Sequence, residues 1–330
     1  MMACGRMAFC ARANLRRRKQ HWSWHAAIRH LAAATAHPGD DPANPAKGEF
    51  DVVARFYPSN AVAQLDAQYG VGGWRISGLA LKLMTSDNVA GPGLFNAPGN
   101  AGKFNVSWMP VDGGWVQGGG YINQGASSHD PAAYPENFTN LTYNSLQSIL
   151  RANPAVVLDT LDFVKQGILA PATYLLAGTN QAFLSALMNA QPTTLLFTAA
   201  DDHVAFNFTS HLYGDDRATN LYSAAILVSA SPLPPPTAEI ESSGNACFLT
   251  FHFKRTAGVT NLTYTVEETA ELNQIPWTLV ACATNGTSMA GTGLVGETDS
   301  DTAGIRDVVV RCSVPTSAAA KRFLRLRITK

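Results

Sequence analysis

Short runs of β-branched and aromatic residues, separated by clusters of turn residues, constrain this fold most strongly. In the run 323–328, leucine and isoleucine alternate with arginine, so one face of a strand is apolar and the other is charged. The 27 glycines and 18 prolines favour many short elements joined by turns over long helices. The sequence therefore predicts an all-β protein.

A proline-rich segment divides the chain into two domains. Four prolines lie within residues 231–236, where they fix φ, remove backbone donors and favour an extended, semi-rigid linker. Residues 49–230 and 237–330 each have the spacing of a β-sandwich.

The expected elements follow from this spacing. In the first domain the strands are expected at 52–57, 74–84, 104–108, 156–163, 194–198, 204–209 and 222–229, and the only helix at Asn180–Asn189. In the second domain the strands are expected at 247–253, 262–267, 277–283, 305–313 and 322–329.

Residues 1–48 form a basic leader. Residues 1–47 carry eight lysines and arginines against two aspartates. The mildly apolar stretch 22–36 that follows the basic cluster is similar to an export signal, with Ala34-x-Ala36 as a cleavage site. A mis-chosen start codon or a disordered leader accounts for the same composition. We expect the leader to lie outside the fold, and export to give an extracellular or cell-surface location.

Several motifs resemble those of exported planctomycete and verrucomicrobial proteins with jelly-roll modules of the DNRLRE type. They are 55–57, 63–70, 73–83, 95–96, 102–108, 115–120 and 208–214 in the first domain, and 262–267, Trp277 and 322–326 in the second. The resemblance implies a jelly-roll-like β-sandwich followed by a smaller C-terminal, immunoglobulin-like β-sandwich. It implies no catalytic residues.

Charge and motifs exclude several function classes. The formal net charge is zero, and the body of the chain has no basic stripe, which argues against nucleic acid as a partner. No apolar run approaches the roughly 18 residues that cross a bilayer. The chain has no Gly-x-Ser-x-Gly, Walker, His-Glu-x-x-His or Cys-x-x-Cys motif. We therefore expect a non-catalytic protein.

One acidic constellation leaves a hydrolase or lyase open. Asp201, Asp202 and His203, followed by His211 and 215–216, have the residue types of a metal site or an acid/base pair. Solvated turn residues beside the strand at 204–209 are the favoured alternative.

Two aromatic residues are the ligand-binding candidates. Trp115 and Tyr121 lie in the glycine-rich stretch, where an exposed ring can stack on a sugar. Trp74 and Trp108 fit the apolar positions of strands and are expected in the core.

The acids Glu297-x-Asp299-x-Asp301 have the spacing of a calcium loop. Thr302 stands where an EF-hand requires glycine, so a surface turn is favoured over a non-EF calcium site. No other cofactor is expected.

Two sets of residues bear on secretion. Asn-x-Ser/Thr sequons occur at Asn105, Asn137, Asn140, Asn207, Asn261 and Asn285, by chance or as glycosylation sites. Cys247, Cys282 and Cys312 of the second domain allow one disulfide, with three pairings open, or three buried small hydrophobes.

Three functions are consistent with the sequence. The first is an exported binding protein whose loops bind surface glycan or extracellular matrix. The second is a structural subunit that self-associates into a filament or surface layer and is glycosylated. A glycan-degrading enzyme is the third.

Overall fold

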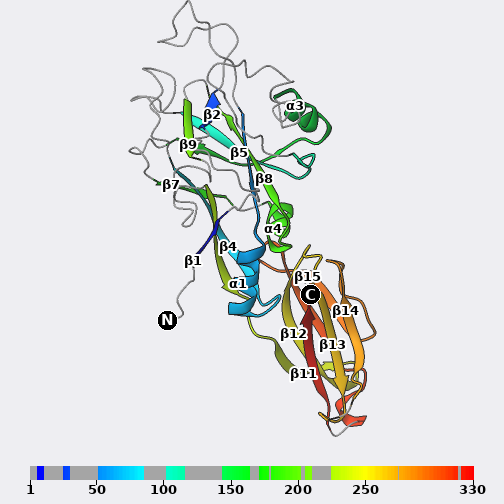
Figure 1. Cartoon of the computed structure of the whole chain (residues 1–330). Helices are drawn as coiled ribbons and strands as arrows, with labels where there is room; N and C mark the ends of the chain where they lie inside the picture. The colour runs from blue at the N-terminus through cyan, green and yellow to red at the C-terminus, as the bar shows by residue number, and fades with distance from the viewer. Residues whose placement is uncertain are drawn as a thin grey trace, which may run out of the picture.

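The computed structural model describes residues 6–10, 25–29, 51–84, 102–115, 143–163, 171–177, 180–201, 205–209, 224–273, 275–318 and 321–330. In this part of the chain two antiparallel β-sandwiches follow one another, with three α-helices in the first (Figure 1). The predicted all-β sandwich fold is confirmed.

The first sandwich is built from two four-stranded sheets. One sheet has the order β1 (Arg6–Cys10), β10 (Ala225–Pro232), β4 (Trp74–Met84) and β7 (Pro171–Leu176). The other has the order β3 (Val52–Phe56), β8 (Thr193–Ala199), β5 (Lys103–Met109) and β6 (Val156–Asp162). A separate pair joins β2 (His25–Arg29) to β9 (Ala205–Thr209).

The strand order is that of a jelly roll. When β2 and β9 are set aside, one sheet takes the first, eighth, third and sixth strands, and the other takes the second, seventh, fourth and fifth. Successive strands therefore cross repeatedly between the two sheets, as in double Greek-key jelly rolls.

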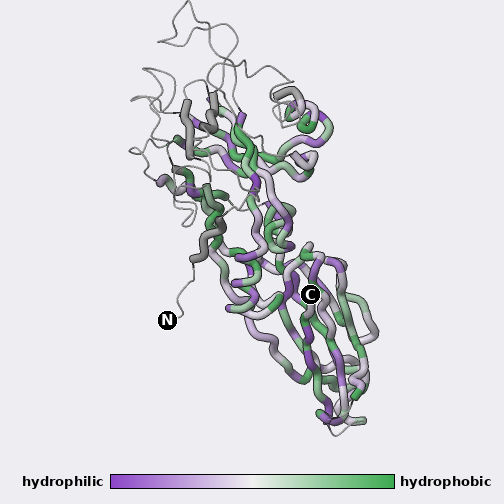
Figure 2. Tube along the Cα trace, viewed as in Figure 1, coloured by the Kyte–Doolittle hydropathy of each residue, from purple (hydrophilic) through white to green (hydrophobic). Residues whose placement is uncertain are grey.

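Alternating side chains build the core between these sheets. In β7, Ala172, Tyr174 and Leu176 are buried, and the residues between them are exposed. The Tyr174 ring meets Phe104 of the opposite sheet edge to face, with 5.3 Å between ring centroids. Figure 2 shows hydrophobic and hydrophilic residues mixed along the strands of both sandwiches.

The second sandwich has an immunoglobulin-like arrangement. One sheet has the order β11 (Thr237–Ser243), β12 (Ala246–Thr256), β16 (Ile305–Arg311) and β15 (Leu294–Asp299). The other has the order β14 (Thr278–Ala283), β13 (Thr263–Thr269) and β17 (Phe323–Thr329). When strands β11–β17 are lettered A, B, C, C′, D, E and F in chain order, the first sheet has the order A-B-E-D of an immunoglobulin domain. A short 3-10 turn, η1 (Thr316–Ala318), precedes β17.

Three helices lie in connections of the first sandwich. The expected helix is α4 (Gln181–Met188), whose N-cap Asn180 accepts a 2.8 Å hydrogen bond from the backbone of Phe183. The expectation of a single helix is wrong, because α1 (Ser59–Tyr69) and α3 (Tyr143–Ala152) are also present. Both are longer than α4, so length is not what hid them; tertiary packing stabilises both, since Leu65 of α1 and Leu146 of α3 are buried.

The structure adds strands that the sequence pattern did not predict: β1, β2, β7, β11 and β15. Two of them lie in the basic leader, which was expected outside the fold: β1 pairs with β10, and β2 pairs with β9. The proline-rich segment also begins inside a sheet, because Pro232 lies opposite Trp74 at the end of β10.

The core of the second sandwich extends into the first. It contains Tyr264, Val266 and other residues of the second sandwich, together with Val62 and Leu65 from α1 and Trp74 from β4. Leu65 is 1% exposed and Trp74 is 3% exposed. The second sandwich therefore completes its core with side chains from the first.

We expect Leu65→Ala, a change in the first sandwich, to destabilise the second. Loss of a buried leucine side chain costs about 2–5 kcal/mol through lost burial and the cavity left behind. Amide hydrogen exchange of β13 should accelerate in this variant. Leu175→Ala is the matched control, because Leu175 is 78% exposed. Faster exchange confined to α1 and β4 would contradict the shared core.

Candidate functional site

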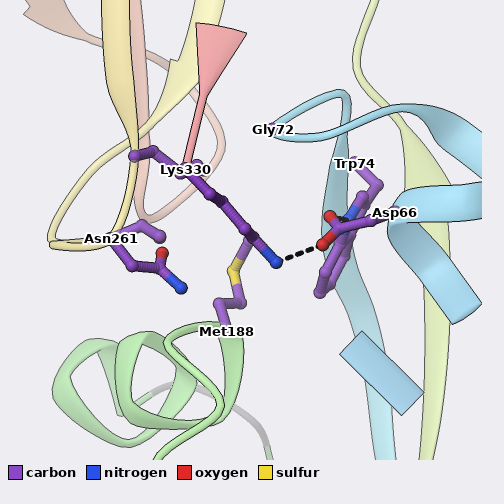
Figure 3. A pocket seen from close by; sticks show the side chains of 8 residues that line it. Asp66, Gly72, Trp74, Met188, Asn261 and Lys330 are labelled. Carbon is purple, nitrogen blue, oxygen red and sulfur yellow. Dashed lines mark hydrogen bonds and ion pairs between the residues drawn. The ribbon is translucent and has the colours of Figure 1, made fainter. Parts of the chain in front are cut away.

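The candidate site is the junction between the two sandwiches. Figure 3 shows Asp66 of α1, Met188 at the end of α4, and Asn261 and Lys330 of the second sandwich around one small cavity. Its volume is about 10 Å³, close to the space that one water molecule needs. The junction is thus closely packed.

Asp66 connects three elements at this junction. Its Oδ1 accepts a 2.9 Å hydrogen bond from the indole Nε1 of Trp74. Its Oδ2 accepts a hydrogen bond from the ammonium group of Lys330, which follows β17 (Figure 3). The Asp66 side chain is 12% exposed, whereas that of Lys330 is 39% exposed, so water reaches the ammonium end of this pair.

A glycine turn brings the two sandwiches close at this point. Gly72 has a φ of 67°, and a Cβ added there would lie 2.8 Å from a side-chain carbon of Ile328 in β17. A side chain at this position would be strained by its backbone and would also collide with the second sandwich.

Asn189, directly after α4, supplies a second set of contacts. Its Oδ1 accepts hydrogen bonds from the backbone N–H of Thr260, at 2.7 Å, and from that residue's hydroxyl, at 3.2 Å. Its Nδ2 donates to the carbonyl of Gly258 at 3.2 Å. One asparagine therefore holds the loop between β12 and β13 from two sides.

These contacts fix the orientation of one sandwich on the other. They combine a shared apolar core, an ion pair and a bidentate amide. These interactions couple the two sandwiches rigidly.

Sequence reasoning missed this site because its partners lie far apart in the chain. Asp66 and Lys330 are 264 residues apart. The only local signal of the site is that Asp66 lies eight residues before Trp74, with a glycine turn between them. No pattern in the sequence indicates that Lys330 binds Asp66.

Trp115 is described by the structure, whereas Tyr121 lies outside the described residues. The Trp115 indole Nε1 donates to Thr194 Oγ1 at 3.2 Å, and the Arg55 guanidinium lies 4.6 Å from the ring centroid. Arg55 also binds Asp112 at 2.6 Å. Trp115 is therefore part of a polar network on the β3-β8 sheet.

Asp112 is the acceptor at the centre of this network. Burial on its own raises the pKa of this carboxyl, but hydrogen bonds from Thr194, from the Gly114 backbone and from Arg55 outweigh burial and lower it. The network therefore adds stability above the pH at which a free aspartate titrates. That contribution is lost as the pH falls through the lowered pKa.

The three acids of the expected calcium loop do not lie together in a turn. Glu297 and Asp299 are in strand β15, and Asp301 follows it. Glu297 is buried against Arg255, whose Nε donates to it at 2.7 Å, and it accepts a second bond from the backbone of Met289. Asp299 pairs with Arg306 at 3.1 Å.

We expect Glu297→Gln to destabilise the second sandwich by about 3–5 kcal/mol, because it leaves the buried Arg255 charge without its counter-charge. The two side chains are 3% and 7% exposed. Asp299→Asn, in an exposed pair, should cost less than about 1 kcal/mol. Urea unfolding measures both. Equal losses would show that burial of the pair contributes nothing.

The sequons differ in accessibility. Asn105 is half-buried and accepts a 2.7 Å bond from Thr160, and the amide oxygen of Asn261 is buried at the junction without a hydrogen-bond partner. Asn207 lies in β9, opposite Ala27. Asn285 is exposed in a turn, with a φ of 51°. Asn137 and Asn140 lie outside the described residues.

Cys247, Cys282 and Cys312 are free thiols, so none of the three pairings is formed in the structure. Burial, together with the neighbouring Glu268 carboxylate, raises the pKa of the Cys312 thiol to about 12. Cys312 therefore behaves as a small buried hydrophobe, and Cys247 is exposed.

The remaining acidic constellation is described only at Asp201, whose Oδ2 accepts a 2.6 Å bond from the backbone of Lys103. Asp202, His203, His211 and residues 215–216 lie outside the described residues. Within the described ranges, no helix is long and apolar enough to cross a membrane.

No protein-family model matches the chain, and the search of curated proteins found no match. The resemblance to DNRLRE-type modules therefore stays a prediction.

We expect Asp66→Ala to lower the free energy of unfolding by about 1–3 kcal/mol, because it leaves the Trp74 N–H and the Lys330 ammonium without their acceptor. Asp162→Ala is the control, since its 4.0 Å pair with Lys103 is largely exposed. Chemical denaturation compares the two variants. A loss no larger than that of the control would contradict the structural role of Asp66.

Proposed function

We propose that this chain is a subunit of a self-assembling protein shell of the viral-capsid type. In this proposal the jelly roll forms the shell wall, and the second sandwich projects from it. The observation that carries the proposal is the strand order of the first sandwich, 1-8-3-6 facing 2-7-4-5. Double-sheet jelly rolls of eight strands build viral capsids, and also occur in lectins and cupins.

The interior of the jelly roll favours a structural role among these classes. Aromatic and aliphatic side chains fill the space between its sheets, among them Phe104, Tyr174 and Phe197. A cupin or another enzyme needs polar groups that converge on a cavity in that space. Because fold alone does not determine function, the inference rests on this filling together with the topology.

The rigid junction supports the second part of the proposal. Helices α1 and α4 lie at one end of the jelly roll. Asp66 of α1 and Asn189, directly after α4, both bind the second sandwich. A domain mounted in this way keeps one orientation relative to the wall. Identical subunits with one fixed domain orientation suit a closed symmetric assembly.

The charge distribution favours a polyanionic cargo. Residues 1–47 carry eight lysines and arginines against two aspartates, and such clusters neutralise the phosphates of nucleic acids. The neutrality of the whole chain argued against nucleic acid as a partner. A shell subunit, however, needs only one basic segment facing the cargo, so we include nucleic acid in the proposal.

Glycan binding is less well supported. The polar edge of the Trp115 ring is bound to Thr194, and Arg55 lies over the ring. Both interactions compete with a sugar for the surface that it would use. Extracellular location and the absence of catalysis stay predictions.

Electron microscopy of the purified full chain tests the shell. We expect closed particles of uniform diameter that contain nuclease-resistant nucleic acid. A variant with Arg16→Ala, Arg17→Ala, Arg18→Ala and Lys19→Ala should contain several-fold less nucleic acid, read from the ratio of absorbance at 260 and 280 nm. Dispersed monomers that are retarded on polysaccharide gels would overturn the shell and favour glycan binding.

A further inference from the structure

Three metal-ligating side chains meet on the outer face of the second sandwich. Glu239 and Glu241 lie two residues apart on edge strand β11, so they share one face, and His252 lies on the neighbouring strand β12. The adjacent Phe253 points into the core, so His252 points outward. Among the described residues, this is the group of three that could hold a metal ion.

We propose that Glu239, Glu241 and His252 bind a divalent transition metal of the zinc class. This proposal does not depend on the shell: it would hold for a monomer as well.

The spacing of the ligand atoms fits such an ion. His252 Nε2 lies 2.9 Å from Glu241 Oε1 and 3.4 Å from Glu239 Oε1, and the ligand atoms of all three residues lie within 4.8 Å of one another. Zinc bonds of about 2.0–2.2 Å in a tetrahedron place neighbouring ligands about 3.3–3.6 Å apart. Small side-chain rotations are enough to reach that geometry, because the backbone ladder already fixes the register.

The charges at this site also favour a cation. Two carboxylates so close together repel each other unless a positive charge lies between them. Two other cations of this sheet face are engaged elsewhere: Lys254 binds Asp307 and Ser300, and Arg311 donates to Ser243. A metal ion or a protonated imidazole can supply the missing charge, and the experiment below separates them.

The donor set indicates which metal. One imidazole with two carboxylates suits zinc and its neighbours, whereas calcium and magnesium prefer oxygen ligands alone. Three protein ligands leave a fourth position for water or an outside ligand. The site is open enough for that, since the Glu239 side chain is 61% exposed and that of Glu241 42%.

Isothermal titration of the full chain with zinc chloride at pH 7.5 tests the proposal. We expect one class of sites that His252→Ala removes and that Glu241→Gln weakens by about 10–100-fold, the loss typical even of outer-shell partners. Glu271→Gln is the matched control, because this exposed glutamate lies outside the cluster. Thermal melts verify that each variant folds.

Cobalt spectra separate this site from the thiols. Nitrogen and oxygen ligation gives weak visible bands, whereas binding at a cysteine such as the exposed Cys247 adds strong near-ultraviolet charge transfer. Weak bands lost in His252→Ala support the proposal. Absence of zinc binding, or zinc and cobalt binding that His252→Ala leaves unchanged, overturns it and assigns the cluster to a histidine held by two carboxylates.

Discussion

The packing of α1 and the start of β4 against the second sandwich is the interaction on which the two-domain arrangement depends. Leu65 and Trp74 lie in the same apolar cluster as Tyr264 and Val266. This cluster places one sandwich firmly on the other, and the polar contacts of Asp66 and Asn189 then select a single orientation. Apolar burial supplies the stability at this junction, and the directional hydrogen bonds supply its geometry.

A buried ion pair lies inside the second sandwich. Arg255 lies between Glu297 and the carbonyl of Thr287, and its guanidinium is 5.5 Å from the centroid of the Tyr264 ring. The Arg255 and Glu297 charges therefore neutralise each other, as burial in a low dielectric requires. The pattern of acids in the sequence suggested a metal loop because it could not show that Arg255 already binds the first of them.

The jelly-roll order and the firm junction together give the protein its proposed role. A jelly roll with an apolar interior offers its outer faces, edges and loops for contact with other molecules, and these are the surfaces through which shell subunits meet. In the proposed shell, the second sandwich is held at one end of the jelly roll and projects away from those contacts. The cluster of Glu239, Glu241 and His252 lies on this second sandwich, so metal binding there would leave the wall contacts free.

The sequence by itself determined the all-β class, most strand positions, helix α4 and the burial of Trp74, because residue periodicity and turn chemistry are local properties. Strand order, the two further helices and the junction were decided only in three dimensions. α1 is helical because Val62 and Leu65 are buried against the second sandwich, and Asp66 has its role because Lys330 approaches it from 264 residues away. Contacts between distant segments leave no periodic trace in the sequence, so only the tertiary structure shows them.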